Sequence, residues 1–145
     1  MSSGRIRPIA ICVIRRDDEI LVFEGRDDTR DLTFYRPLGG EIEFGERGED
    51  AIRRELLEEI DAELADLRLL TVTENTFTFE GEPWHEIVFV FEARLADPIL
   101  YERDTFIVHE EGWTDMPALW RSIDSFDMTS APLYPDGLLD LLRGP

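Results

Sequence analysis

The chain contains no lysine, because each of its 15 basic residues is arginine. This absence excludes the lysine of a P-loop, a lysine Schiff base with a pyridoxal cofactor, and a lysine general base. The sequence also lacks the G-x-S-x-G pattern that surrounds the nucleophile of α/β-hydrolases. Four common catalytic strategies are therefore set aside before any motif is considered.

Cysteine and long apolar runs are scarce as well. Cys12 is the single cysteine, and its place in an apolar run predicts a buried small side chain rather than a nucleophile or a metal ligand. No apolar run approaches the ~20 residues of a membrane span. The start of the chain is interrupted by charge too early for a signal peptide. We expect a cytoplasmic protein without a membrane partner.

Acidic residues outnumber basic ones, 33 to 15, which gives a formal net charge of −18. Such a charge disfavours a nucleic-acid polymer or an anionic membrane surface as partner. A small phosphorylated molecule would also be repelled at long range, so its site would need a metal ion and nearby arginine. With 145 residues and 43% apolar content, the chain is expected to form a single domain over residues 1–145.

The pattern of apolar residues and turns predicts a mixture of strands and helices. Near-continuous or alternating apolar residues predict strands over 6–14, 19–23, 67–79, 86–95 and 106–108. Helical spacing predicts helices over 49–60, 116–123 and 137–142. A polar loop is expected over 25–31, and a short extended segment over 34–37. This order is typical of an α/β fold in which helices cover a mixed sheet.

The stretch over residues 39–62 joins a glycine-rich turn to the longest predicted helix. At about 100° per residue, Glu55, Glu58 and Glu59 share one edge of that helix, beside an apolar stripe. Like charges at this spacing cost roughly 0.2–0.5 kcal/mol per pair. A solvated acidic helix is one interpretation, and a divalent cation held by hard carboxylate oxygens is the other.

The spacing of this stretch favours the second interpretation. Gly40, Glu46 and the run Arg54-Glu55-Leu56-Leu57-Glu58-Glu59 resemble the Nudix box, which here covers Gly40–Ala62. Asp61 stands where that family normally has glycine. Glycine serves the helix exit, where a left-handed residue often closes the last turn. The departure therefore concerns the geometry of the exit rather than the acidic side chains.

The resemblance implies a Nudix-type α/β/α sandwich with a mixed sheet, and a pyrophosphohydrolase dependent on Mg²⁺, or on Mn²⁺ in its place. Carried over residue by residue, it assigns metal ligation to Glu58 and Glu59, and a ligand or general-base role to Glu55. Arg54 would orient or neutralise a neighbouring acid. The Gly39 carbonyl would be a further ligand, and Glu46 would lie beside the ligands and the substrate. The catalytic set is then Glu55, Arg54 and Glu58.

Outside this stretch the candidates are fewer. Arg36 and Arg26 are proposed to contact substrate phosphate, because a guanidinium matches phosphate oxygens in pairs. An ion pair with one of the many acids is the alternative for each. Glu110 and Glu111 are candidates for an additional catalytic acid, and an ordinary solvated loop acid is the alternative for both.

Two functions remain open on the sequence alone. The favoured one is hydrolysis of a pyrophosphate linkage in a nucleotide, a nucleotide sugar or a dinucleotide. The other is a non-catalytic Nudix-like module that senses a nucleotide without cleaving it. The partner in either case is a small phosphorylated molecule, and a homodimer would be common for a soluble protein.

Overall fold

The computed structural model describes residues 4–109 and 115–144. Its strands are β1 (Ile6–Val13), β2 (Arg15–Arg16), β3 (Glu19–Asp27), β4 (Leu32–Glu41), β5 (Leu64–Phe79), β6 (Glu82–Leu95), β7 (Thr105–Val108) and β8 (Met116–Ser122). Its helices are α1 (Gly48–Ile60) and α2 (Leu138–Arg143), with 3₁₀ turns η1 (Pro98–Glu102) and η2 (Ile123–Ser125).

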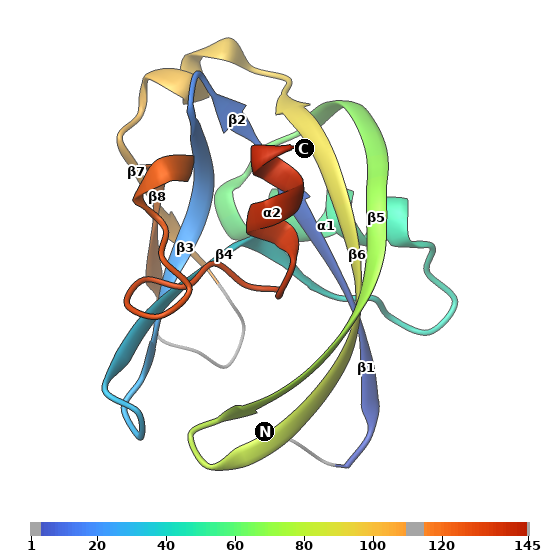
Figure 1. The fold of residues 1–145 in the computed structure, drawn as a ribbon. Coiled ribbons are helices and arrows are strands. Elements are labelled where there is room, and N and C mark those ends of the chain that lie inside the picture. Colours follow the sequence, from blue (N-terminus) through green and yellow to red (C-terminus); the bar gives the residue numbers. More distant parts are fainter. Residues whose placement is uncertain (1–3, 110–114, 145) are drawn as a thin grey trace.

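The strands form one mixed sheet in the order β5-β6-β1-β4-β3-β8-β7, with β2 paired to β3 (Figure 1). Strand β1 runs parallel to β6 and antiparallel to β4, so it lies in the middle of the sheet. From Ile9 onward its residues are buried on both faces, which explains why this part of its sequence is continuously apolar.

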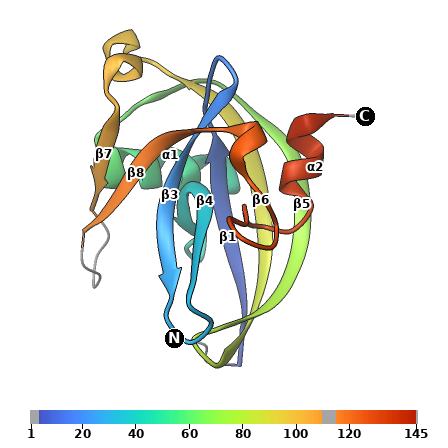
Figure 2. The ribbon, with the colours of Figure 1, turned by 60° about the vertical axis from the view of Figure 1, so that its left-hand side comes forward.

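Two hydrophobic cores lie on opposite faces of this sheet. Ala10 and Cys12 of β1 pack in the core that α1 covers, whereas Ile9, Ile11 and Val13 pack in the core that α2 covers. Figure 2 shows the two helices on either side of the central strands. The predicted α/β sandwich with a mixed sheet is therefore confirmed. None of the described helices is both long and apolar enough to cross a membrane.

The tips of two long hairpins are fastened to each other by a buried carboxylate. Asp27 is 0% exposed and accepts hydrogen bonds from the Arg30 side chain (2.9 Å) and from the Glu80 backbone (3.4 Å). The rings of Phe34 and Phe79 lie 5.9 Å apart beside it. These contacts hold the β5–β6 hairpin against the β3–β4 hairpin.

The predicted helix over 116–123 is wrong. This segment forms strand β8 and the first residue of η2. Met116, Leu119 and Trp120 imitate helical spacing, but pairing with β3 and β7 turns Ala118 and Trp120 into the core in strand alternation. The loop predicted over 25–31 is also shorter than expected, because β3 continues to Asp27.

Candidate functional site

Helix α1 buries one face and leaves the next face charged. Its buried apolar residues are Ala51, Ile52, Leu56 and Ile60. The helix begins after Arg47 without a side-chain cap, and Glu49 and Asp50 occupy its first turn. Acidic residues at this end are favoured by the helix dipole. The predicted helix over 49–60 is confirmed almost to the residue.

Asp61 ends α1 in the left-handed conformation, with φ 54° and ψ 42°. Its N–H donates to the Leu57 carbonyl (3.0 Å), and the N–H of Ala62 donates to the Leu56 carbonyl (3.3 Å). The exit geometry that glycine would serve is therefore kept, because aspartate tolerates this conformation better than most residues do.

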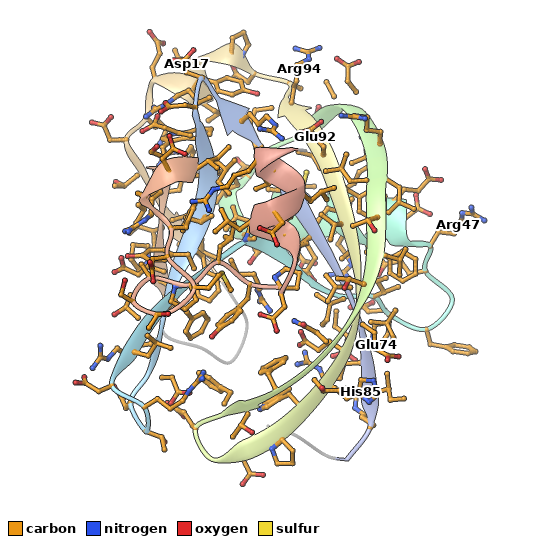
Figure 3. All side chains as sticks on the ribbon, viewed as in Figure 1. Asp17, Arg47, Glu74, His85, Glu92 and Arg94 are labelled. Carbon is orange, nitrogen blue, oxygen red and sulfur yellow. The ribbon has the colours of Figure 1, made fainter. Side chains whose placement is uncertain are left out.

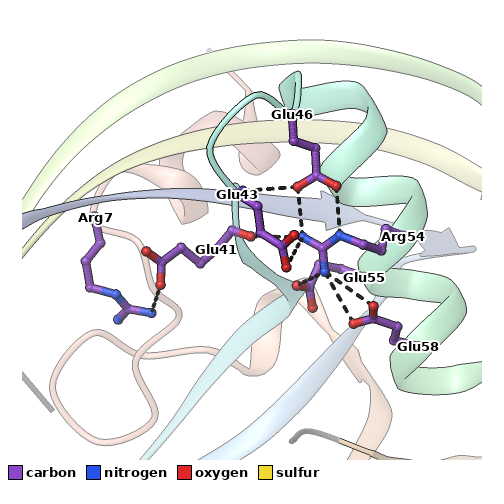
Figure 4. A network of polar contacts seen from close by, with 7 residues as sticks. All are labelled: Arg7, Glu41, Glu43, Glu46, Arg54, Glu55 and Glu58. Carbon is purple, nitrogen blue, oxygen red and sulfur yellow. Dashed lines mark hydrogen bonds and ion pairs between the residues drawn. The ribbon is translucent and has the colours of Figure 1, made fainter.

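Arg54 joins the acidic residues of this region (Figure 4). Its Nε and Nη2 donate to the two carboxylate oxygens of Glu46, at 2.7 and 2.9 Å. Its Nη1 donates to Glu55 (2.8 Å) and lies 3.3 Å from Glu58. Its Nη2 also reaches the Glu41 carbonyl (3.1 Å). One guanidinium thus pairs with four acids, Glu43 at 3.8 Å included, and ties the loop and the backbone after the glycine pair to α1.

This contact changes the ionisation of both partners. The paired hydrogen bonds from Arg54 lower the pKa of Glu46 to about 2. The same contact, with Glu55 as a further partner, raises the pKa of Arg54 above its ordinary value. Both groups are consequently charged at neutral pH, and the Glu55 carboxylate lies against a permanent cation.

The two glycines before Glu41 are required by close packing. A Cβ on Gly40 would lie 2.5 Å from the Glu55 carboxyl group. A Cβ on Gly39 would lie 2.0 Å from the carbonyl oxygen of Ala10 in β1. The Ala10 backbone leaves no room for a side chain at Gly39, whereas a side chain at Gly40 would displace the Glu55 carboxyl group, so these positions bring the backbone of β4 directly under Glu55 and against β1.

Glu58 and Glu59 differ in their surroundings. The Glu58 side chain is 56% exposed, whereas Glu59 is 4% exposed and its carbonyl accepts a hydrogen bond from the His109 backbone (3.1 Å). Over residues 4–109 and 115–144, no three His, Cys, Asp or Glu side chains are grouped so that they could hold a metal ion. The hard carboxylate oxygens fit Mg²⁺ in type. Their present arrangement is not that of a metal site, because Glu55 and Glu58 are directed at Arg54.

The predicted residues outside this group have varied positions. Arg26 pairs with Asp28 (3.3 Å) and with Asp31, the ion-pair alternative left open by the sequence. The Arg36 guanidinium lies 5.5 Å from the centre of the Phe23 ring, and its buried Nε has no hydrogen-bond partner among the described residues. Glu110 and Glu111 lie outside the described residues.

Sequence reasoning missed the charges that surround Glu41. Its carboxylate pairs with Arg5 (2.8 Å), which directly precedes β1, and with Arg7 (3.3 Å), the second residue of β1. A hollow of about 520 Å³ opens here, and its lining includes Arg5, Pro8, Glu41, Glu43, Phe44 and Glu55. One signal was present, since Arg5 directly precedes an otherwise apolar strand and Arg7 interrupts its start.

A model of the NUDIX domain matches residues 5–136 of the chain. Among curated proteins, the NAD-capped RNA hydrolase NudC of Edwardsiella ictaluri is 34% identical over 95 residues, which cover 63% of this chain and 33% of that protein. NudC of Pseudomonas syringae pv. syringae is 38% identical over 64 residues, which cover 44% of this chain and 22% of that protein. The chain thus aligns with a third or less of the length of these two relatives.

Solved structures show the same fold at lower sequence identity. The MutT protein of Bacillus halodurans superposes with a TM-score of 0.62 and 16% identity, covering 95% of this chain and 80% of that one. A NUDIX hydrolase from Nitrosomonas europaea gives a TM-score of 0.59 and 21% identity, with 83% and 74% covered. At these identities the likeness concerns the fold.

Proposed function

The chain belongs to the NUDIX family, and from that premise we propose that it is a Mg²⁺-dependent pyrophosphohydrolase acting on a nucleoside diphosphate derivative. The observation that carries the proposal is the group formed by Glu46, Arg54, Glu55 and Glu58 beside the Gly39–Gly40 backbone. Glu55 of this group lines a hollow of about 520 Å³, which lies within the size range of small-molecule sites.

We assign metal ligation to Glu55, Glu58 and Glu59 together with the Gly39 carbonyl. A bound Mg²⁺ would neutralise phosphate charge and stabilise the departing phosphate. Glu58 is the most exposed of these acids, and its contact with Arg54 is the longest, so it is the one most easily released toward a cation. Mn²⁺, with a similar preference for oxygen, is expected to substitute.

Arg54 keeps Glu55 in place. Its hydrogen bond fixes one carboxylate oxygen of Glu55 over Gly40, where a side chain would collide. Oε1 of Glu55 accepts this hydrogen bond from Arg54. We propose that Glu55 serves as a ligand or as the base that takes a proton from the attacking water. Arg36 is proposed to contact phosphate, because its Nε has no hydrogen-bond partner among the described residues.

The substrate is proposed to be a nucleotide, a nucleotide sugar or a dinucleotide. The curated relatives are named for hydrolysis of NAD-capped RNA, which places NAD among the compounds to screen.

We also propose a cytoplasmic location. Cys12 is compatible with it, because it is the single cysteine of the chain, it is a buried free thiol, and one thiol cannot form a disulfide within the chain.

Replacing the proposed metal ligands tests the assignment. In Glu58→Gln and Glu59→Gln we expect Mg²⁺-dependent release of the phosphate-bearing product to fall by about 10²–10³-fold, because each loses a charged group at the reacting phosphate. Glu63→Gln, an exposed acid just after α1, is the control and should retain activity. Circular dichroism and thermal unfolding establish that each variant is folded. Full activity in both ligand variants would overturn the proposal.

A nucleotide sensor without hydrolysis is the second candidate. It is favoured by one observation, that Arg54 already occupies the carboxylates of Glu55 and Glu58. A sensor would bind nucleotide equally well with and without Mg²⁺ and release no product. Calorimetric titration with ADP, in Mg²⁺ and then in EDTA, separates the two functions when it is combined with the product assay.

A further inference from the structure

Exposed apolar side chains gather on the outer part of the sheet face that α1 covers. Val72 lies opposite Phe89, and Leu69 lies opposite Phe91, so each pair shares one face of the sheet. This is the face of α1, because a Cβ on Gly48 in its first turn would lie 3.3 Å from the Phe91 ring and 3.7 Å from the Phe89 ring. Leu69 and Val72 are nevertheless 50% and 46% exposed. Helix α1 therefore leaves these two side chains of β5 largely in solvent.

The apolar surface continues along β6 toward β1. Ile87 is two residues from Phe89 on the same face, is half-buried, and lies opposite Pro8 of β1. Pro8 lines the hollow of Glu55 together with Phe44, whose ring is fully exposed in the loop before α1. An aromatic ring in water forgoes the burial that usually stabilises it. We call the four side chains on the strands the β5–β6 patch: Leu69, Val72, Ile87 and Phe89.

The free edge of β5 is poorly suited to pairing with another strand. Strand β5 comes first in the order of the sheet, so one of its sides has no neighbouring strand among the described residues. Its pairing with β6 is shifted twice, between Ala65 and Arg68 and between Leu69 and Thr71. Asp66, within the first shift, has a positive φ angle. Such irregularities and charged side chains discourage an additional strand. We therefore expect a partner to pack on the face of the sheet rather than to extend it.

Two exposed residues of opposite charge flank the β5–β6 patch. Arg47 directly precedes α1 and is 82% exposed, whereas Glu74 follows Val72 on the same face of β5 and is 69% exposed. Their own ion pairs, with Glu49 and His85, are long at 3.7 Å each. Figure 3 shows Arg47 and Glu74 on the same side of the molecule, beside the edge formed by β5. A two-fold axis between them, in the plane of an interface, would bring Arg47 of each copy against Glu74 of the other. The charges around the patch are thus complementary to themselves.

We propose that a second copy of this chain covers the β5–β6 patch, in a symmetric dimer in which Phe44 of each copy packs on the patch of the other. The two contacts between Arg47 and Glu74 then flank an apolar centre. An aromatic ring buries roughly 150–250 Å², so two such rings, with the patches that they cover, approach the ~1,000 Å² of a specific interface. The net charge of −18 on each copy opposes association and is reduced in effect by salt. This proposal concerns assembly and does not depend on the hydrolase assignment.

Analytical ultracentrifugation of the wild-type chain tests for the dimer. The measurement is made at about 100 µM protein in about 300 mM NaCl, so that the repulsion between the net charges is screened. We expect the main species to have twice the 16.8 kDa mass of the chain and the dissociation constant to be micromolar. A chain that stays monomeric under these conditions would overturn the proposal.

Variants of the patch locate the interface. Leu69→Thr/Val72→Thr introduces threonine, which suits a strand, in place of apolar surface, and Phe44→Ser removes the exposed ring. Each should weaken the dimer at least tenfold. The matched controls are Ile107→Thr, on edge strand β7, and Ile99→Ser, in η1, which also replace exposed apolar residues and should dimerise like the wild type. Circular dichroism and thermal unfolding establish that each variant is folded. If the patch variants dimerise as well as the controls do, the interface lies elsewhere and the proposal is wrong.

Reversal of charge tests the contact between Arg47 and Glu74. Arg47→Glu and Glu74→Arg should each weaken the dimer about three- to tenfold, because each single change brings like charges together at two places. The double variant should recover most of the wild-type affinity, since each reversed residue again meets an opposite charge. The single changes move the net charge in opposite directions, so a general effect of charge cannot produce both losses. A double variant that dimerises no better than the weaker single variant would refute this arrangement of the two copies.

Discussion

Aspartate takes the place of glycine at several turns of this chain. Five residues other than glycine have positive φ angles in the described structure, namely Asp17, Asp31, Asp61, Asp66 and Glu80. Aspartate visits the left-handed region more readily than most residues, because its short side chain can bond locally. Part of the large acidic excess is therefore a consequence of how the turns are formed, and it carries a small conformational cost at each position.

Asp61→Gly should make the protein more stable. Glycine removes the steric cost of φ 54° and also removes a negative charge from the C-terminal end of α1, so we expect unfolding free energy to rise by about 1 kcal/mol and the melting temperature by about 3 °C. Thermal unfolding measures the change. Asp50→Gly, in the first turn of the same helix, is the contrasting control and should lower stability by a similar amount. A lower melting temperature in Asp61→Gly would contradict the account of the exit.

At the scale of elements, α1 and the loop before it form one unit. Arg54 on the helix holds Glu46 in the loop through two hydrogen bonds, and Glu46 in turn accepts a bond from the Glu43 backbone (3.1 Å). The path of the chain between β4 and α1 therefore depends on a charged pair rather than on apolar packing. Its stability should follow the ionisation of Glu46.

The ion pair between Glu46 and Arg54 predicts how the free energy of unfolding depends on pH. Folding lowers the Glu46 pKa from 4.5 to about 2, so its contribution to stability is present above pH 4.5 and is lost as the pH falls toward 2. Glu46→Gln should lower the free energy of unfolding by on the order of 1 kcal/mol at pH 7, since Arg54 keeps other partners and solvent screens the pair. The difference should shrink by pH 3. Urea unfolding at pH 7, 5 and 3 measures it, with Glu49→Gln as the control. A difference that does not change with pH would refute the linkage.

The sequence predicted elements best where local pattern and tertiary packing agree. Helix α1 and strand β1 were located almost to the residue because their apolar periodicity matches the faces they bury. Strand β8 was not, because neighbouring strands override its local helical spacing. The contacts of Glu46, Glu55 and Glu58 with Arg54 lie within one contiguous stretch. Arg5 and Arg7 escaped notice because they reach Glu41 only through the pairing of β1 with β4, a long-range contact that no local pattern encodes.

At the scale of the whole molecule, the net charge of −18 shapes which substrates can approach. The charge repels any anion at distances within the screening length, and the repulsion grows with the number of phosphates on the approaching molecule. A dinucleotide carries few charges, whereas an RNA carries one per nucleotide. The chain should therefore prefer a short substrate to an RNA polymer, although its curated relatives are named for hydrolysis of capped RNA.

A comparison of NAD with NAD-capped RNA measures this effect. If the chain hydrolyses NAD, we expect kcat/KM for a capped 20-nucleotide RNA to be at least tenfold lower at 50 mM salt, because the RNA is repelled. The gap should narrow as salt is raised to 300 mM, since screening weakens the repulsion. Free adenosine diphosphate ribose is a matched short substrate. A preference for the RNA at low salt would contradict the prediction.

Arg54 also matters for how the protein is prepared. The chain supplies its own counter-ion to the acidic side chains of α1, so an added ion is not needed to neutralise them during folding. After treatment with EDTA, we expect the circular dichroism spectrum to stay essentially unchanged and the melting temperature to fall only by the amount that bound Mg²⁺ contributes through mass action. One stripped preparation could then be loaded separately with Mg²⁺, Mn²⁺ or Ca²⁺, and differences in rate would report on the ions rather than on how much protein had survived.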